Sequence, residues 1–178
     1  MGQQLIPAPG YRTPGGVSSL ASQVSVSAVA TTTTIINYLV PINTLAVGTT
    51  YRLFASGTVD NAAASPTFNW SLRVGGVSIA TAQIPSVTAA TSAKAWTVEG
   101  LLTLRVVGAS GKIVGSIQLL NEIAATFTAA VNIDSPIVNA GTFNTTTALS
   151  LDLVMFMGAA AAGNIMRAET GSIELVRL

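Results

Sequence analysis

The feature that most constrains this fold is an alternation of apolar and polar side chains along the chain, with a period of two residues. In the segment 67–74, Phe68, Trp70, Leu72 and Val74 occupy every second position, with Thr, Asn, Ser and Arg between them. Successive side chains of an extended strand point to opposite faces, so this pattern is typical of a strand with one buried face. We therefore predict a β-strand here, with Trp70 in the core.

The same alternation recurs along most of the chain, and helix is poorly supported. Thr, Val, Ser, Gly and Asn dominate where a surface helix would carry Glu, Lys and Arg four residues apart. Short strands separated by turn residues are typical of an all-β, antiparallel β-sandwich or barrel. A loop is predicted around 84–94 and a hairpin turn at 108–111. The other predicted strands are 22–29, 50–59, 96–106, 113–119, 149–157 and 171–178, with shorter candidates at 35–42, 77–83, 123–131 and 164–169.

The chain length fits one domain preceded by an arm. A chain of 178 residues can bury about 70% of its unfolded surface around a single core. Residues 1–20 are rich in Pro and Gly, which disfavour helices and central strands, and are predicted to form an extended N-terminal arm. Residues 21–178 are predicted to form the sandwich. Leu5, Ile6 and Tyr11 give the arm apolar anchors, which we expect to contact a neighbouring subunit.

The residue types that are missing exclude several kinds of active site. The sequence has no His and no Cys, which excludes a Ser-His-Asp triad, a His-bearing zinc site, a thiolate nucleophile and a disulfide. With a net charge of +1, the chain lacks the excess of basic residues that neutralises nucleic-acid phosphates. We therefore predict a non-enzymatic protein with no catalytic residues, no cofactor, no metal site and no nucleic-acid partner.

No segment predicts a membrane span or an export signal. The longest apolar run, 153–163, has about half of the ~20 residues that a spanning helix needs. The start of the chain lacks the basic region followed by an apolar region that marks a secretory signal. We expect a protein that is made in the cytoplasm and has no membrane partner.

The scarcity of charged residues predicts that much of the surface is covered in an assembly. Only 8% of the residues are charged, against about 25% in a typical soluble domain. Outward positions of the predicted strands are often apolar, and a free monomer with such a surface tends to associate. We predict a homo-oligomer; the alternative is a monomer that Ser, Thr and Asn side chains keep in solution.

The segment 149–157 supplies a second set of predicted interface residues. Asp152 has the opposite parity to the leucines beside it, so it should point away from the core. Val154 and Phe156 share its face, and a carboxylate among apolar neighbours suggests a covered face with an Arg or Lys partner. The alternative is a solvated Asp on a sheet surface.

Acidic and aromatic residues allow three further interpretations, each with an ordinary alternative. Asp60 and the segment 132–135 place oxygen atoms on loops, as a calcium site would, but Asp and Asn are also common turn formers. Paired carboxylates could serve a glycosidase, but Glu99 and Glu174 lie at outward strand positions where pairing with Arg or Lys is usual. The two tryptophans could stack on a sugar, but their strand parity favours the core.

Four stretches resemble the jelly-roll modules of tailed-bacteriophage virion proteins: LVPINTLAVGTTYRLFASGTV (39–59), TFNWSLRVGG (67–76), WTVEGLLTLRVVG (96–108) and GSIELVRL (171–178). Capsid decoration proteins, head fibres and tail-fibre modules form this group. The resemblance implies a jelly-roll sandwich, a structural role in the virion, assembly in the host cytoplasm, and partners such as the major capsid protein and copies of itself, with a trimer favoured. Its alternative is a receptor- or carbohydrate-binding tip of a fibre. It transfers no site residue.

Overall fold

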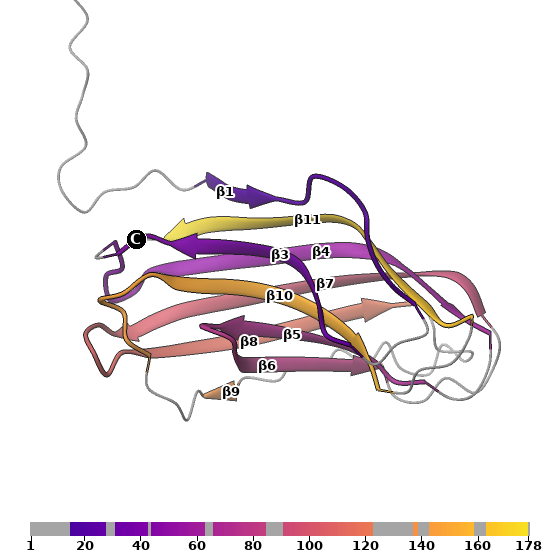
Figure 1. Ribbon diagram of the computed structural model, residues 1–178. Helices are drawn as coiled ribbons and strands as arrows, with labels where there is room; N and C mark the ends of the chain where they lie inside the picture. The colour runs from indigo at the N-terminus through magenta and orange to yellow at the C-terminus, as the bar shows by residue number, and fades with distance from the viewer. Residues whose placement is uncertain are drawn as a thin grey trace, which may run out of the picture.

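Two antiparallel sheets packed face to face form a β-sandwich (Figure 1). The structure is a computed structural model and describes residues 15–27, 31–42, 44–62, 66–84, 91–122, 137–138, 143–158 and 163–177. In spatial order, the large sheet contains β1 (Gly15–Ser19), β11 (Ile165–Arg177), β4 (Thr50–Asn61), β7 (Thr91–Val106), β8 (Lys112–Asn121) and β9 (Ile137–Val138), and β2 (Val24–Ser27) also pairs with β11. The small sheet contains β3 (Thr33–Val40), β10 (Leu149–Met157), β5 (Phe68–Val74) and β6 (Val77–Ile84).

The all-β, antiparallel β-sandwich predicted from the sequence is confirmed, and the jelly-roll path within it stays a prediction. Two tight hairpins each join neighbouring strands of one sheet: β5–β6 in the small sheet and β7–β8 in the large sheet. Among the described residues no helix is long and apolar enough to cross a membrane.

The core lies between the two sheets and follows the alternation of the sequence. In β4 every second residue from Tyr51 to Asn61 is buried. Trp70 of the small sheet and Trp96 of the large sheet are 0% and 1% exposed, and their ring centroids lie 5.0 Å apart with the rings tilted by 51°. Such tilted aromatic pairs contribute about 0.5–1.5 kcal/mol beyond the area that they bury. The tryptophans therefore anchor the core, as predicted, and leave no aromatic platform for a sugar at these positions.

Glycines on the inner face of the large sheet make room for these large side chains. A Cβ atom at Gly100 would lie 2.5 Å from Leu72 of the opposite sheet. A Cβ atom at Gly57 would lie 1.8 Å from the Arg167 carbonyl oxygen and 2.9 Å from the Trp96 ring. Both distances are far below van der Waals contact, so neither position accepts a side chain without moving the packed elements.

The main differences from the predicted elements arise at bulges and at strand ends. The predicted strands 164–169 and 171–178 belong to one strand, β11. A bulge between Ala168 and Thr170 reverses the parity of its buried residues, and for this reason the sequence pattern indicates two strands. The predicted loop around 84–94 is shorter than expected, since β7 begins at Thr91. Candidate strand 123–131 lies outside the described residues.

The predicted arm has two parts in the structure. Residues 15–19, which the sequence assigned to the arm, form β1 and pair with β11 at the edge of the large sheet. Residues 1–14, with the predicted anchors Leu5, Ile6 and Tyr11, lie outside the described residues.

Replacing Trp70 with Ala should lower the free energy of unfolding by about 3–5 kcal/mol, because it removes a fully buried ring and leaves a cavity between the sheets. Urea denaturation followed by circular dichroism measures this loss. The matched control is Leu120→Ala at a side chain that is 53% exposed, where we expect a change within about 0.5 kcal/mol. Ready quenching of native tryptophan fluorescence by iodide would contradict the burial of both rings.

Candidate interaction surfaces

One end of the sandwich is built from tight turns, and we call it the turn end. It is the end at which β3, β5, β7 and β11 finish and β4, β6, β8 and β10 begin, and the C-terminus lies there (Figure 1, left). Backbone pairing brings these termini together: Leu149 pairs with Val40, Gly48 donates to the Leu104 carbonyl, and Gly75 donates to the Ser150 carbonyl. The described turn-end segments are 41–42, 44–49, 75–76, 107–111 and 143–148.

Exposed apolar side chains gather at the turn end. Of the nine large hydrophobic residues that are exposed among the described residues, only Leu101 and Leu120 lie elsewhere. Single exposed apolar residues are ordinary, but a group at one end of a molecule is typical of an interaction site. The other seven are Leu39, Ile42, Val47, Val77, Val106, Val107 and Val176, which are 42–62% exposed.

The charged residues that accompany this apolar group are basic. Arg105 and Lys112 are exposed, and Lys112 lies directly opposite Val106 in the β7–β8 hairpin. Within the described part of the chain, the ion pairs involve neither of them. A partner with an apolar centre and acidic side chains around it would therefore complement the turn end.

The turn between β7 and β8 is held in a defined conformation. Gly111 and Phe143 exchange two backbone hydrogen bonds, of 2.8 and 3.0 Å. The Thr145 hydroxyl oxygen accepts a hydrogen bond from the Gly108 amide at 2.8 Å, and the Thr145 amide donates to the Gly108 carbonyl at 3.0 Å. Thr145 itself is buried. The apolar residues of this turn are thus presented on a fixed backbone, which lowers the entropy cost of docking.

Asp152 points away from the core, as its parity predicted, but its surroundings are polar. It is partly exposed and lies between Asn37 of β3 and Arg73 of β5. Its Oδ2 atom accepts a hydrogen bond from the Ser150 hydroxyl at 2.9 Å. Arg73 is its basic cross-strand neighbour, but none of the described ion pairs joins these two residues, so the expected basic partner stays a prediction.

Val154 and Phe156 share the outward face of β10 with Asp152 but differ from the expected apolar surface. Val154 is only 2% exposed, because Thr34 and Ser71 flank it from the neighbouring strands in the middle of the sheet. Phe156 is half-buried. Val154 is therefore on the expected face but is already covered within the subunit, and an interface role for Asp152, Val154 and Phe156 stays a prediction.

The outer face of the large sheet carries the predicted cross-strand ion pairs. Arg52 of β4 lies between Glu99 of β7 and Glu174 of β11, at 2.9 Å and 3.9 Å. These two carboxylates raise the pKa of Arg52 above its ordinary value, chiefly through the hydrogen bond that Arg52 donates to Glu99. A hollow of about 140 Å³ beside Glu99 is smaller than the roughly 300–1,000 Å³ of ligand pockets. Glu99 and Glu174 thus have the ordinary pairing role rather than the geometry of a glycosidase.

Asp60 joins three strands of the large sheet. Its carboxylate pairs with Arg167 of β11, and its Oδ1 atom accepts a hydrogen bond from the Ala93 amide at 2.6 Å in the bulged start of β7. Ala93 has a φ of 49°, a left-handed conformation that non-glycine residues rarely adopt. Both carboxylate oxygens are therefore engaged within the protein, which favours the structural interpretation over calcium binding. The second loop considered for calcium, 132–135, lies outside the described residues.

The sequence alone did not predict the turn end as a site. The sequence pattern indicates that Val107 and Val176 are outward apolar residues. Leu39, Ile42 and Val47 come from a different part of the chain, so the pattern does not show that they lie near these valines. The signal available was the presence of apolar residues in a segment, 41–49, that joins two predicted strands. Only the strand order of the two sheets brings these segments to one end.

Comparison with known proteins adds no relationship to these observations. No family model matches the chain, and no curated protein matches it. The assignment of the candidate surfaces therefore rests on the geometry of this structure and on the sequence.

The stabilising role of Asp60 should depend on pH. The Ala93 amide and then the Arg167 guanidinium hold the pKa of Asp60 below its ordinary value, so this stabilisation is complete above about pH 4 and is lost as the pH falls through the lower folded value. Asp60→Asn should lower the free energy of unfolding at pH 7 by about 1–2 kcal/mol. In urea denaturation between pH 7 and pH 2, the gap between wild type and variant should close on the acid side. A gap that stays constant over this range would contradict the prediction.

Proposed function

We propose that the protein is a non-enzymatic structural component of a phage virion, which oligomerises and binds neighbouring capsid or tail subunits. The observation that carries this proposal is the turn end: an exposed apolar group with basic residues beside it, on a chain that has few charges elsewhere. Association buries such a group and contributes roughly 25 cal/mol for each Å² of apolar surface removed from water. The assignment to a virion rests on the resemblance of the four strand segments to phage jelly-roll modules.

The mechanism of this function is binding rather than chemistry. The turn end would seat on an apolar, acidic surface of an adjacent subunit, and copies of the chain would stabilise the particle by linking its subunits. Partners are further copies of this chain, with a trimer favoured, and other virion proteins such as the major capsid protein. The protein would be made in the host cytoplasm and then join the virion.

The second candidate, a receptor- or carbohydrate-binding tip, has one observation in its favour. On the outer face of the small sheet, Phe156 lies opposite Asn69, and Asn69 Oδ1 accepts a hydrogen bond from Gln83 Nε2 at 2.9 Å. Asn69 itself is buried, but an aromatic ring beside the exposed amide of Gln83 is the kind of surface that binds sugars. Glycan-array binding that Phe156→Ala abolishes, and that turn-end variants leave unchanged, would favour this candidate.

Purified protein should sediment as an oligomer, with about three times the 18.1 kDa mass of the chain. Val47→Glu combined with Val107→Glu should shift it toward the mass of one chain, because carboxylates cannot enter an apolar interface without a large desolvation cost. The matched control is Leu120→Glu, at an equally exposed residue far from the turn end. Tryptophan emission reports that each variant is folded. A wild-type protein that sediments only as 18.1 kDa at micromolar concentration would contradict the oligomer.

The role in the virion is tested on particles of the phage whose genome encodes the chain. Mass spectrometry of purified particles should find its peptides at a fixed stoichiometry to the major capsid protein, and electron microscopy should place the sandwich on the particle surface. The turn end should face the neighbouring subunit. Particles without the protein at any stage of assembly would refute the proposal.

A further inference from the structure

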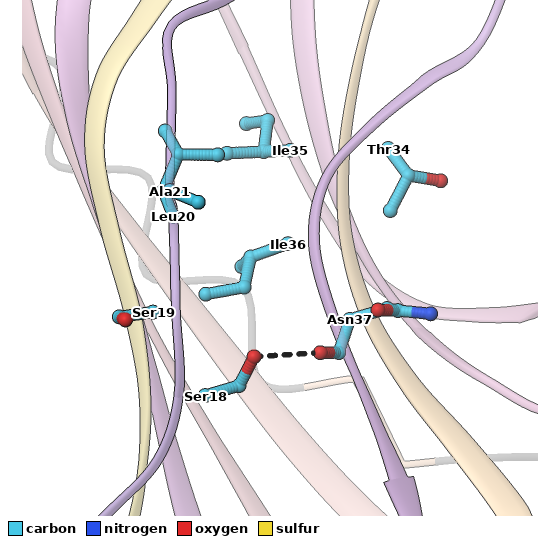
Figure 2. A pocket seen from close by; sticks show the side chains of 8 residues that line it. All are labelled: Ser18, Ser19, Leu20, Ala21, Thr34, Ile35, Ile36 and Asn37. Carbon is cyan, nitrogen blue, oxygen red and sulfur yellow. Dashed lines mark hydrogen bonds between the residues drawn. The ribbon is translucent and has the colours of Figure 1, made fainter.

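A groove of about 370 Å³ opens along the side of the sandwich, between the C-terminal end of β1 and the strand β3 (Figure 2). Leu20, Ile35 and Ile36 form its apolar floor, and both isoleucines are almost fully buried. Ser18 and Asn37 close one end of the groove, where the Ser18 hydroxyl donates a hydrogen bond to the Asn37 carbonyl at 2.9 Å. The volume lies within the range of roughly 300–1,000 Å³ that binding sites for small ligands have.

The groove adjoins the free edge of the small sheet. β3 is the terminal strand of that sheet and pairs only with β10. Because the Asn37 carbonyl points toward β1, the alternation of an antiparallel ladder directs the N–H and C=O groups of Leu39 to the same edge. A register shift beside Ile35 also interrupts the pairing of β3 with β10. The edge therefore offers backbone hydrogen-bonding groups next to an apolar floor, which is what an extended peptide needs for docking.

The groove is lined by neutral side chains, and this restricts its occupant. The Ser18 hydroxyl and the Asn37 backbone carbonyl lie at the rim, while the side chains of Thr34 and Asn37 point away from the groove (Figure 2), and none of the lining residues is charged. A strongly charged peptide would lose its hydration there without gaining an ion pair. The occupant should therefore be an extended, nearly neutral segment with one or two apolar anchors.

We propose that this groove receives residues 1–14 of a second copy of the chain, with Leu5 and Ile6 as the anchors. This segment contains one charged side chain, Arg12, and its prolines favour an extended conformation with little entropy left to lose on docking. Fourteen extended residues reach up to about 46 Å, which is enough to cross to an adjacent subunit. The inference rests on the subunit-linking function proposed above and names the segment and the receiving site.

The course of β1 favours a second copy over the same chain. The groove lies beside the C-terminal end of β1, whereas residues 1–14 join β1 at its N-terminal end, Gly15. To enter its own groove the segment would have to reverse direction and run back along β1. A segment that arrives from a neighbouring copy needs no such reversal.

Cysteine cross-linking tests the proposal directly, because the chain contains no Cys of its own. A Leu5→Cys chain is mixed with a Ser18→Cys chain that carries a mass tag, and the mixture is oxidised mildly. Ser18 is half-buried at one end of the groove, and its side chain points into it (Figure 2). The expected product is a disulfide-linked pair of the two variants. The matched control is Gln118→Cys, exposed on the outer face of the large sheet, and the docked pair should form at least about tenfold more product because docking raises the effective thiol concentration.

A chain with both Leu5→Cys and Ser18→Cys distinguishes the source of the segment. Cross-links between copies, which a synthetic peptide of residues 1–14 reduces, support the proposal. A disulfide within one chain at high dilution overturns it in favour of docking onto the same subunit. Equal product with Ser18→Cys and Gln118→Cys in a protein that still sediments as an oligomer overturns the groove assignment alone. Monomeric wild-type protein overturns the oligomer as well.

Discussion

The contact between the two sheets through Trp70 and Trp96 is the constraint on which the rest of the sandwich depends. Without disulfides, the sheets are held together by interdigitated apolar side chains, and these two rings are the largest of them. Gly100 allows the close approach, since a Cβ atom there would lie 2.5 Å from Leu72 of the opposite sheet, and Gly57 makes room for the Trp96 ring within the large sheet. This contact sets how the two sheets lie on each other. The turns at one end and the groove beside β3 therefore also have fixed positions.

The strands could largely be predicted from the sequence. In a two-layer sandwich the side chains that face the core recur at every second residue, and the sequence shows this period as an alternation of apolar and polar residues. β4 follows the alternation along its length, whereas β5 is buried at every position except Arg73, including Asn69 and Ser71 between its apolar residues. The prediction failed where a bulge changes that period: Ile35 and Ile36 are both buried in β3, and the parity of β11 changes at Glu169. Val154 shows a further limit. Its parity gives its face correctly, but its exposure depends on the neighbouring strands β3 and β5, which the local sequence does not contain.

All the ion pairs among the described residues lie in the large sheet. Arg52 holds two carboxylates across β7 and β11, and the Asp60–Arg167 pair joins β4 to β11 at the other end of that sheet. Between them, the hydroxyl pair Ser56–Thr170, at 2.8 Å, connects β4 and β11 without any charge. Electrostatic repulsion between copies of such a surface is weak, so apolar contacts at the turn end meet little opposition when chains approach each other.

The turn end and the groove offer different kinds of contact, and this difference bears on how an assembly would hold together. The turn end is a rigid apolar surface, so its contribution grows with the area that a partner covers. The groove instead offers backbone hydrogen bonds at a strand edge together with a small apolar floor, which suits an extended segment rather than a folded surface. If both contacts form between the same two subunits, the second becomes intramolecular, and its effective concentration rises to the millimolar range. Two contacts that would each be weak in isolation could then together hold an assembly.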